Sequence, residues 1–182
     1  ITASASMYLI KTIFSVVLSI GMILFGHGYP FKPIQLTVIS ACCVGIPTFF
    51  LTYEPNFKRV SGDFLKTVFK NAFPFAFMIA ICSTIIVNGG RVLGLEKEML
   101  STICVLLTSW CYYNGLRHIY SPLSHYRIFV IYIMQIVLYI SLIVGHQFLG
   151  LGNIDYIGAI TLMFLVTFSK VIYLLNFELF DY

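Results

Sequence analysis

The stretch QLTVISACCVGIPTFFLTYEPN, residues 35–56, decides how this chain folds. It is long enough to cross a bilayer, since roughly 20 apolar residues span the hydrocarbon core, but it carries Gly45 and Pro47 near its middle. Proline has no N–H, so the carbonyl of Cys43, four residues earlier, loses its helical partner. The pattern predicts a membrane helix interrupted at Gly45-Ile46-Pro47, which would expose carbonyl oxygens inside the protein. A proline kink that serves packing alone is the alternative.

The composition indicates an integral membrane protein. Hydrophobic residues make up 59% of the 182 residues and charged residues 10%, with a mean hydropathy of +0.94, against roughly 25% charged residues in soluble domains. The formal charge of +4 then reflects loops that set the topology, and we expect no nucleic-acid partner. The cysteines lie inside apolar runs without the spacing of a metal site, so we expect buried, reduced thiols at Cys42, Cys43, Cys82, Cys104 and Cys111.

Apolar runs separated by short polar turns predict a single all-α domain over residues 1–182, a bundle of six transmembrane helices. The spans fall at about 5–26, 34–53, 65–87, 100–116, 128–148 and 156–175. Trp110, Tyr112 and Tyr113 in the fourth span fit an aromatic belt at the membrane surface. Lysine and arginine are more frequent in one set of loops, which predicts that both termini are cytoplasmic. That set holds Lys58, Arg59, Lys66, Lys70, Arg117 and Arg127, and the opposite set holds Lys32, Arg91 and Lys97.

Lys11 lies early in the first span and shares a helix face with Ser15 and Ser19, because residues four apart are neighbours on a helix. Two interpretations of this lysine are open. Its ammonium group reaches the near membrane surface along an extended side chain, or it stays inside the bundle as a fixed positive charge that repels cations or pairs with a carboxylate.

The motifs of soluble catalytic domains are absent from the sequence, so we expect that this chain alone is not an enzyme. His118 and His125 are seven residues apart with a proline between them, which is not the spacing of a metal site. Because residue 1 is Ile and no signal-peptide pattern precedes the first span, we expect the C-terminal piece of a longer protein.

A second class of protein is open at this point. The chain fits a non-catalytic six-helix membrane protein, either a secondary carrier or an assembly subunit. A carrier is often built from two repeats, and residues 1–90 show no similarity to residues 91–182.

Around the interruption the sequence resembles the sixth membrane helix of P-type cation-transporting ATPases. The matching residues are Gly45-Ile46-Pro47 followed by Glu54 and Pro55, with YLIKTIF before the helix and PFKPIQL in the turn that leads into it. The resemblance is greatest to the bacterial branch called cation-transporting ATPase E. It is strong over residues 8–63 and weaker beyond, and it implies that the six spans correspond to helices five to ten of the family.

This resemblance implies the membrane domain of an ATP-driven cation pump in the plasma membrane of a bacterium. An upstream part of the same protein would carry membrane helices one to four, the phosphorylated aspartate and the nucleotide domain, with ATP and Mg²⁺ as its cofactors. The partners of this chain would be the lipid bilayer, that upstream part and the transported cation, for which Ca²⁺ is a candidate.

The chain departs from the better-known calcium and sodium pumps at their ion ligands. Those pumps have an Asp directly before the glycine, where this chain has Val44, and an Asn four residues earlier, where it has Ser40. On the fifth helix their Asn and Glu fall at Ile13 and Val16. Carboxylates of this half therefore cannot coordinate an ion at mid-membrane.

Hard cations bind several oxygen atoms, so the resemblance leaves carbonyls near Cys43 and serine hydroxyls as the ligands from this half. The candidate ion-pathway residues are Ser15, Ser40 and Cys43, and we expect their side chains to converge on one cavity. Gly45, Pro47 and Lys11 are the candidate structural or gating residues, with Lys11 as a counter-cation after the transported ion has left.

Overall fold

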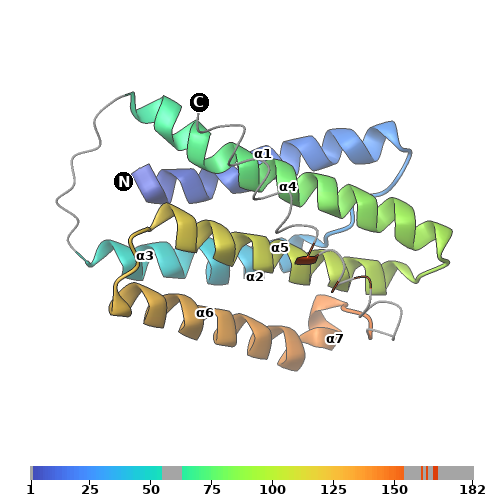
Figure 1. Cartoon of the computed structure of the whole chain (residues 1–182). Helices are drawn as coiled ribbons and strands as arrows, with labels where there is room; N and C mark the ends of the chain where they lie inside the picture. Colours follow the sequence, from blue (N-terminus) through green and yellow to red (C-terminus); the bar gives the residue numbers. More distant parts are fainter. Residues whose placement is uncertain (1, 55–62, 154–160, 162, 164–165, 168–182) are drawn as a thin grey trace.

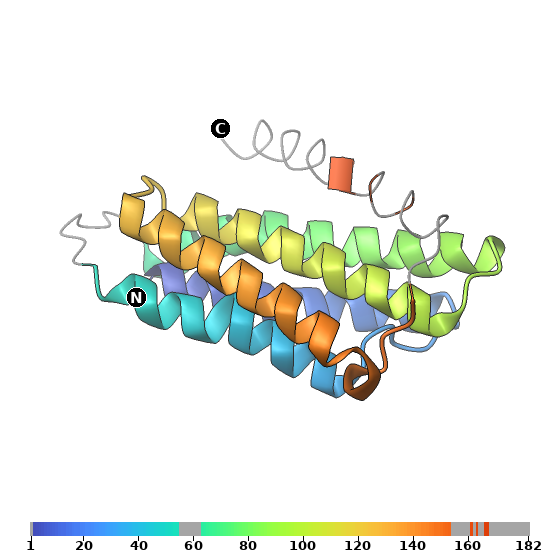
Figure 2. The ribbon, with the colours of Figure 1, turned by 90° about the horizontal axis from the view of Figure 1, so that it is seen from below.

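The computed structural model describes residues 2–54 and 63–153, together with residues 161, 163, 166 and 167. Its helices are α1 (Thr2–Leu24), α2 (Pro33–Ile39), the π-helix η1 (Ser40–Gly45), α3 (Ile46–Thr52), α4 (Phe64–Val92), α5 (Lys97–Ile119), α6 (His125–Val144) and α7 (His146–Leu149). The long helices run side by side in an elongated bundle (Figures 1 and 2). Within these residues the protein is helical and contains no strand, which confirms the all-α prediction. Most of the sixth predicted span, 156–175, lies outside the described residues.

The outward faces of the helices are apolar, as a lipid-facing surface requires. In α1, Met7, Ile10, Phe14 and Leu18 follow a spacing of three or four residues and are buried, whereas residues on the opposite face are exposed. The exposed large side chains of α1 and α6 include Val16, Ile20, Ile23, Phe129, Ile136, Ile140 and Ile143. Four segments are long and apolar enough to cross a membrane, namely α1, α2 through α3, α4 and α6. The protein is therefore a membrane protein.

Helix α5, the predicted fourth span, occupies the inside of this bundle. It contacts α1, α2, η1, α4 and α6, and Figure 2 shows it between α4 and α6. It is 23 residues long, yet its sequence is too polar to count among the four apolar segments. Because its neighbours shield it from lipid, α5 tolerates serine, threonine and tyrosine on several faces.

Gln35 fixes the start of α2 against this inner helix. Its side chain is fully buried, and its Oε1 accepts hydrogen bonds from the Lys32 N–H and the Ser101 hydroxyl, each at 2.9 Å. Its Nε2 donates to the carbonyl of Leu149 at 3.0 Å. All three contacts satisfy groups that would otherwise be costly in an apolar interior.

Helices α4 and α5 approach closely at Gly90, where a Cβ atom would collide with the side chain of Leu100. We expect Gly90→Val to destabilise the protein by about 2 kcal/mol, because inserted volume in a packed interior forces side chains and backbone to shift. Gly89→Val is the matched control, since a Cβ at the exposed Gly89 meets no atom within 4 Å. Thermal unfolding in detergent would measure both, and equal losses would show that helix propensity, and not packing, sets the effect.

Candidate functional site

The second membrane segment is interrupted by a wide, π-helical turn. Its Ile46 N–H donates to the carbonyl of Ala41, five residues back, in place of the usual four. This turn covers 40–45. It begins five residues before the predicted triplet Gly45-Ile46-Pro47 and ends at the first residue of that triplet, Gly45. The interruption is thus confirmed, and it takes the form of a widened helix that continues into α3.

The wide turn determines which carbonyl lacks a backbone donor. The amide of Ile46, which an α-helix would offer to Cys42, is used on Ala41, and Pro47, five residues after Cys42, has no N–H. The sequence argument placed the freed carbonyl at Cys43. The π register adds the carbonyl of Cys42.

A side chain from α5 supplies the missing donor. The hydroxyl of Tyr113 donates to the carbonyl oxygen of Cys42 at 3.3 Å in the buried interior. Next to it, the buried hydroxyl of Thr48 donates to the carbonyls of Val44 at 2.6 Å and Gly45 at 3.1 Å. The interruption is therefore lined by carbonyl oxygens that accept hydrogen bonds from hydroxyl groups.

The thiol of Cys43 belongs to the same cluster. It is fully buried and lies within hydrogen-bonding reach of the Tyr113 and Ser109 side chains. Ser109 and Tyr113 are four residues apart and so share one face of α5. We call the group formed by Cys42, Cys43, Thr48, Ser109 and Tyr113 the hydroxyl–carbonyl cluster.

Tyr113 is the main residue that the sequence analysis missed. It was assigned with Tyr112 to an aromatic belt at the membrane surface, and this is wrong, because each ring is 1% exposed. Their burial follows from the position of α5 inside the bundle. The polar residues at 102, 109 and 113, which recur on one helix face, were the signal that could have indicated it.

The other candidate pathway residues lie outside this cluster. Ser40 is half-buried and its hydroxyl donates to the Leu36 carbonyl at 2.6 Å. Ser15 is also half-buried; its carbonyl accepts from the Ser19 hydroxyl at 2.7 Å, and its side chain meets that of Tyr29. The two cavities described for this structure are not lined by Ser15, Ser40 or Cys43. Their convergence on one cavity stays a prediction.

The remaining gating candidates have distinct surroundings. Pro47 is buried and Gly45 is half-buried at the junction between η1 and α3. Lys11 has intermediate exposure beside the buried face of α1, which is compatible with either interpretation of its role.

A second polar cluster ties the end of α3 to the start of α6. Arg127 is 7% exposed; its Nε donates to Glu54 Oε2 at 2.7 Å, and its Nη1 donates to the carbonyls of Tyr120 at 2.8 Å and Pro122 at 3.1 Å. Ser124 caps α6 and donates to the same carboxylate oxygen at 2.9 Å. The hydrogen bond from Ser124 and the Arg127 guanidinium lower the pKa of Glu54. The sequence analysis counted Arg127 as a loop cation and missed this contact.

Within the described part of the chain, no group of three or more His, Cys, Asp and Glu side chains could hold a metal ion. The oxygen atoms that the described residues present at the interruption are those of carbonyl and hydroxyl groups, a ligand type that hard cations prefer.

Comparison with known proteins found no matching family model and no matching solved structure. The chain is 30% identical over 135 residues to the probable cation-transporting ATPase exp7 of Streptococcus pneumoniae serotype 4, a match that covers 70% of this chain and 17% of that protein. It is 27% identical over 120 residues to the calcium-transporting ATPase CtpE of Mycobacterium tuberculosis, with coverage of 57% and 15%. The match to CtpE of Mycolicibacterium smegmatis is 26% over 116 residues.

The chain thus spans about one sixth of the length of the curated relatives it matches. The matched part agrees with the apolar helices described above, since both indicate a membrane region. These relatives confirm the resemblance stated from the residues around Pro47 and identify the chain as a membrane segment homologous to cation-transporting ATPases.

Proposed function

We propose that this chain is the membrane domain of an ATP-driven cation pump of the P-type, and that it contributes part of the ion pathway at the π-helical interruption. The names of the relatives support the pump. The location of the ion pathway rests on the Cys42 carbonyl, which accepts a hydrogen bond from a tyrosine hydroxyl in place of a backbone donor. A carbonyl bound this way can exchange its hydroxyl donor for a cation without breaking the helix.

In this proposal the remainder of the protein supplies the aspartate that is phosphorylated, the nucleotide domain and further ion ligands, with ATP and Mg²⁺ as cofactors. The protein would lie in a bacterial plasma membrane with both termini of this domain in the cytoplasm. Ca²⁺ is the first ion to test, because CtpE is named a calcium-transporting ATPase.

The cluster suggests a specific role for Tyr113. Its hydroxyl satisfies the Cys42 carbonyl while no ion is bound, and it gives up that carbonyl when a cation arrives. Tyr113 is then a positioning residue that competes with the ion for one oxygen atom. Such competition lowers affinity and favours release, which a pump needs on the side where the ion leaves.

Tyr113→Phe tests this role in the complete protein. We expect the half-saturating cation concentration for ATP hydrolysis to fall about tenfold, because an unsatisfied buried carbonyl destabilises the ion-free state by roughly 1–3 kcal/mol. The maximal rate should fall as well, since release becomes slower. Tyr112→Phe is the matched control; it removes the same atom from the neighbouring buried ring, which packs against Phe14, and should leave the half-saturating concentration unchanged.

A rise in the half-saturating concentration for Tyr113→Phe would contradict the proposed competition. The pump itself has a separate test. If the gene encoding this chain carries no in-frame DKTGT-type phosphorylation motif upstream, and the purified protein does not hydrolyse ATP on addition of Ca²⁺ or other cations, a carrier or assembly subunit becomes the better assignment.

A further inference from the structure

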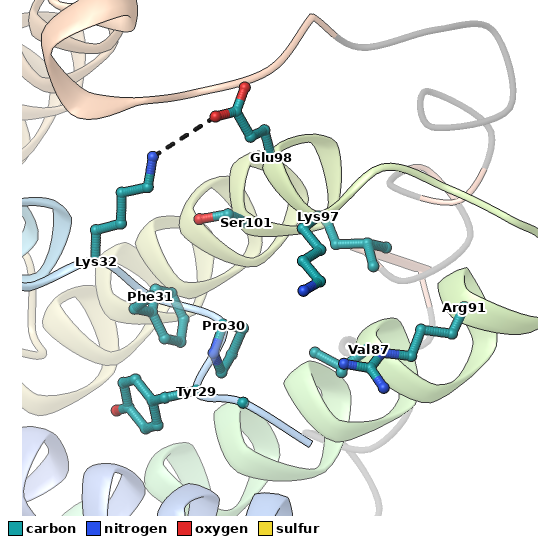
Figure 3. A pocket seen from close by; sticks show the side chains of 11 residues that line it. Tyr29, Pro30, Phe31, Lys32, Val87, Arg91, Lys97, Glu98 and Ser101 are labelled. Atoms are coloured by element: carbon teal, nitrogen blue, oxygen red, sulfur yellow. Dashed lines mark ion pairs between the residues drawn. The ribbon is translucent and has the colours of Figure 1, made fainter. Parts of the chain in front are cut away.

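A cavity of about 430 Å³ opens at the end of the bundle where α1 turns into α2 and α4 turns into α5. Figure 3 shows that its walls come from the 28–32 turn, the last turns of α4 and the first turn of α5. This volume lies in the range of small-ligand sites, roughly 300–1,000 Å³. The cavity is separate from the hydroxyl–carbonyl cluster, because the two share no residue.

The charged groups of the cavity are mostly cations. Among the described residues that line it, the cations are Lys32, Arg91 and Lys97, and the one carboxylate is that of Glu98. Lys32 is partly engaged, since its Nζ lies 3.8 Å from Glu98 Oε1 and donates to the Gly150 carbonyl at 3.3 Å. In Figure 3, Arg91 and Lys97 extend into the space from opposite elements, α4 and α5.

Arg91 is held in place by a neutral partner. Its Nη1 lies 2.7 Å from Nδ1 of His27, and Nε2 of His27 lies 3.0 Å from Oδ1 of Asn88. With Nδ1 as acceptor and Nε2 as donor, this tautomer of the imidazole carries no charge, and among the described carboxylates none forms an ion pair with Arg91. The contact uses one of the five N–H donors of the guanidinium, which can bind phosphate oxygens in a bidentate manner.

The backbone adds to this positive field. The 23-residue helix α5 begins at Lys97, and its N-cap residue Glu96 makes no side-chain cap. The amides of the first turn at this end carry partial positive charge. The remaining lining is apolar or aromatic and includes Tyr29, Phe31, Val87 and Leu100.

We propose that this cavity binds a phosphate-bearing anion, either the headgroup of an anionic phospholipid or free inorganic phosphate. Basic pockets between membrane helices bind anionic headgroups by the same chemistry. The apolar wall fits the first carbons of the acyl chains of a lipid. Exposed apolar side chains close in sequence to the lining, Leu24, Phe25, Val92 and Leu93, would contact the rest of those chains. This site is independent of ion transport and needs no turnover to detect.

Native mass spectrometry of the complete protein in detergent tests the site with dioleoyl-phosphatidylglycerol. Each cation near an anionic surface contributes about fivefold in affinity. We therefore expect Lys97→Gln to weaken the tightest binding event about fivefold, and Arg91→Gln with Lys97→Gln to weaken it about twenty-fivefold. Glu98→Gln should strengthen binding, because it removes a carboxylate that lines the cavity, the one present among the described lining residues, and releases Lys32.

The control pair Lys66→Gln with Lys70→Gln removes the same charge from the opposite end of α4 and should not change that event. Equal loss in both pairs would overturn the site, since affinity would then follow net charge. Unchanged binding in Glu98→Gln would overturn it as well, since the charges that line the cavity would then not act on the ligand. Dioleoyl-phosphatidylcholine and inorganic phosphate are the comparison ligands. Phosphate binding with the same dependence on the variants assigns the site to the free anion, selective binding of phosphatidylglycerol assigns it to lipid, and equal binding of phosphatidylcholine overturns it.

Discussion

Replacing Pro47 with alanine is expected to reduce cation-dependent ATP hydrolysis of the complete protein at least tenfold, the scale on which loss of a group that positions a metal ligand acts. The alanine brings back an N–H that can donate to Cys42 or Cys43. The wide turn at 40–45 is then no longer required, and the segment can form an ordinary α-helix. In that helix the carbonyl of Cys42 would bind a backbone N–H and would no longer accept from Tyr113. Hydrolysis and ⁴⁵Ca²⁺ uptake in proteoliposomes would measure the loss.

Pro74→Ala is the matched control. Pro74 is also a buried proline within a membrane helix, but α4 continues through it as an α-helix. Its replacement should leave ion-dependent hydrolysis near the wild-type rate. Wild-type activity in Pro47→Ala would show that the interruption serves packing alone, and equal losses in both variants would show a general effect of removing membrane prolines.

The interruption could be predicted because its cause is local. Proline lacks an N–H wherever it occurs, so Gly45 and Pro47 predict a missing helical hydrogen bond from the sequence alone. The form of the gap could not be predicted in this way. A π turn becomes stable when another element supplies the missing donor, and here that donor is Tyr113, 71 positions after Cys42 in the chain.

That the protein is a membrane protein could also be predicted from the sequence, since composition and apolar runs reflect the solvent around the protein. The position of α5 inside the bundle could not be predicted from the sequence, because a helix surrounded by other helices needs no lipid-compatible face. Its polar residues therefore indicate a shorter or interfacial span when read alone. This is why Ser109 and Tyr113 were left out of the candidate site, while Ser15 and Ser40, on the more apolar segments, were included.

Arg127 shows the same limit for charged residues. Counting lysine and arginine in loops treats every cation as solvated, whereas the guanidinium of Arg127 binds Glu54 and two backbone carbonyls in a nearly closed site. Glu54 lies two residues after the end of α3 at Thr52. The contact therefore holds the C-terminal end of the interrupted segment against the turn between α5 and α6.

Arg127→Met is expected to destabilise the protein by about 3 kcal/mol, because the carbonyls of Tyr120 and Pro122 lose their donor and methionine cannot replace it. The midpoint of thermal unfolding in detergent should fall by roughly 5–10 °C. Arg117→Met is the matched control: this cation lies over the ring of Tyr132, 5.0 Å from its centroid, and its loss should lower the midpoint by much less. Equal shifts would show that burial of Arg127 contributes nothing specific.

The carboxylate makes the same contact dependent on pH. Because Ser124 and Arg127 hold the pKa of Glu54 below its ordinary value of 4.5, the contact contributes its full stabilisation above pH 4.5. That contribution is lost as the pH falls through the lowered pKa and the carboxylate becomes protonated. Glu54→Gln should therefore be less stable than the wild type at neutral pH, and the two unfolding midpoints should converge as the pH falls below 4.5. A constant difference down to the lowest accessible pH would show that the charge of Glu54 does not stabilise this end of the bundle.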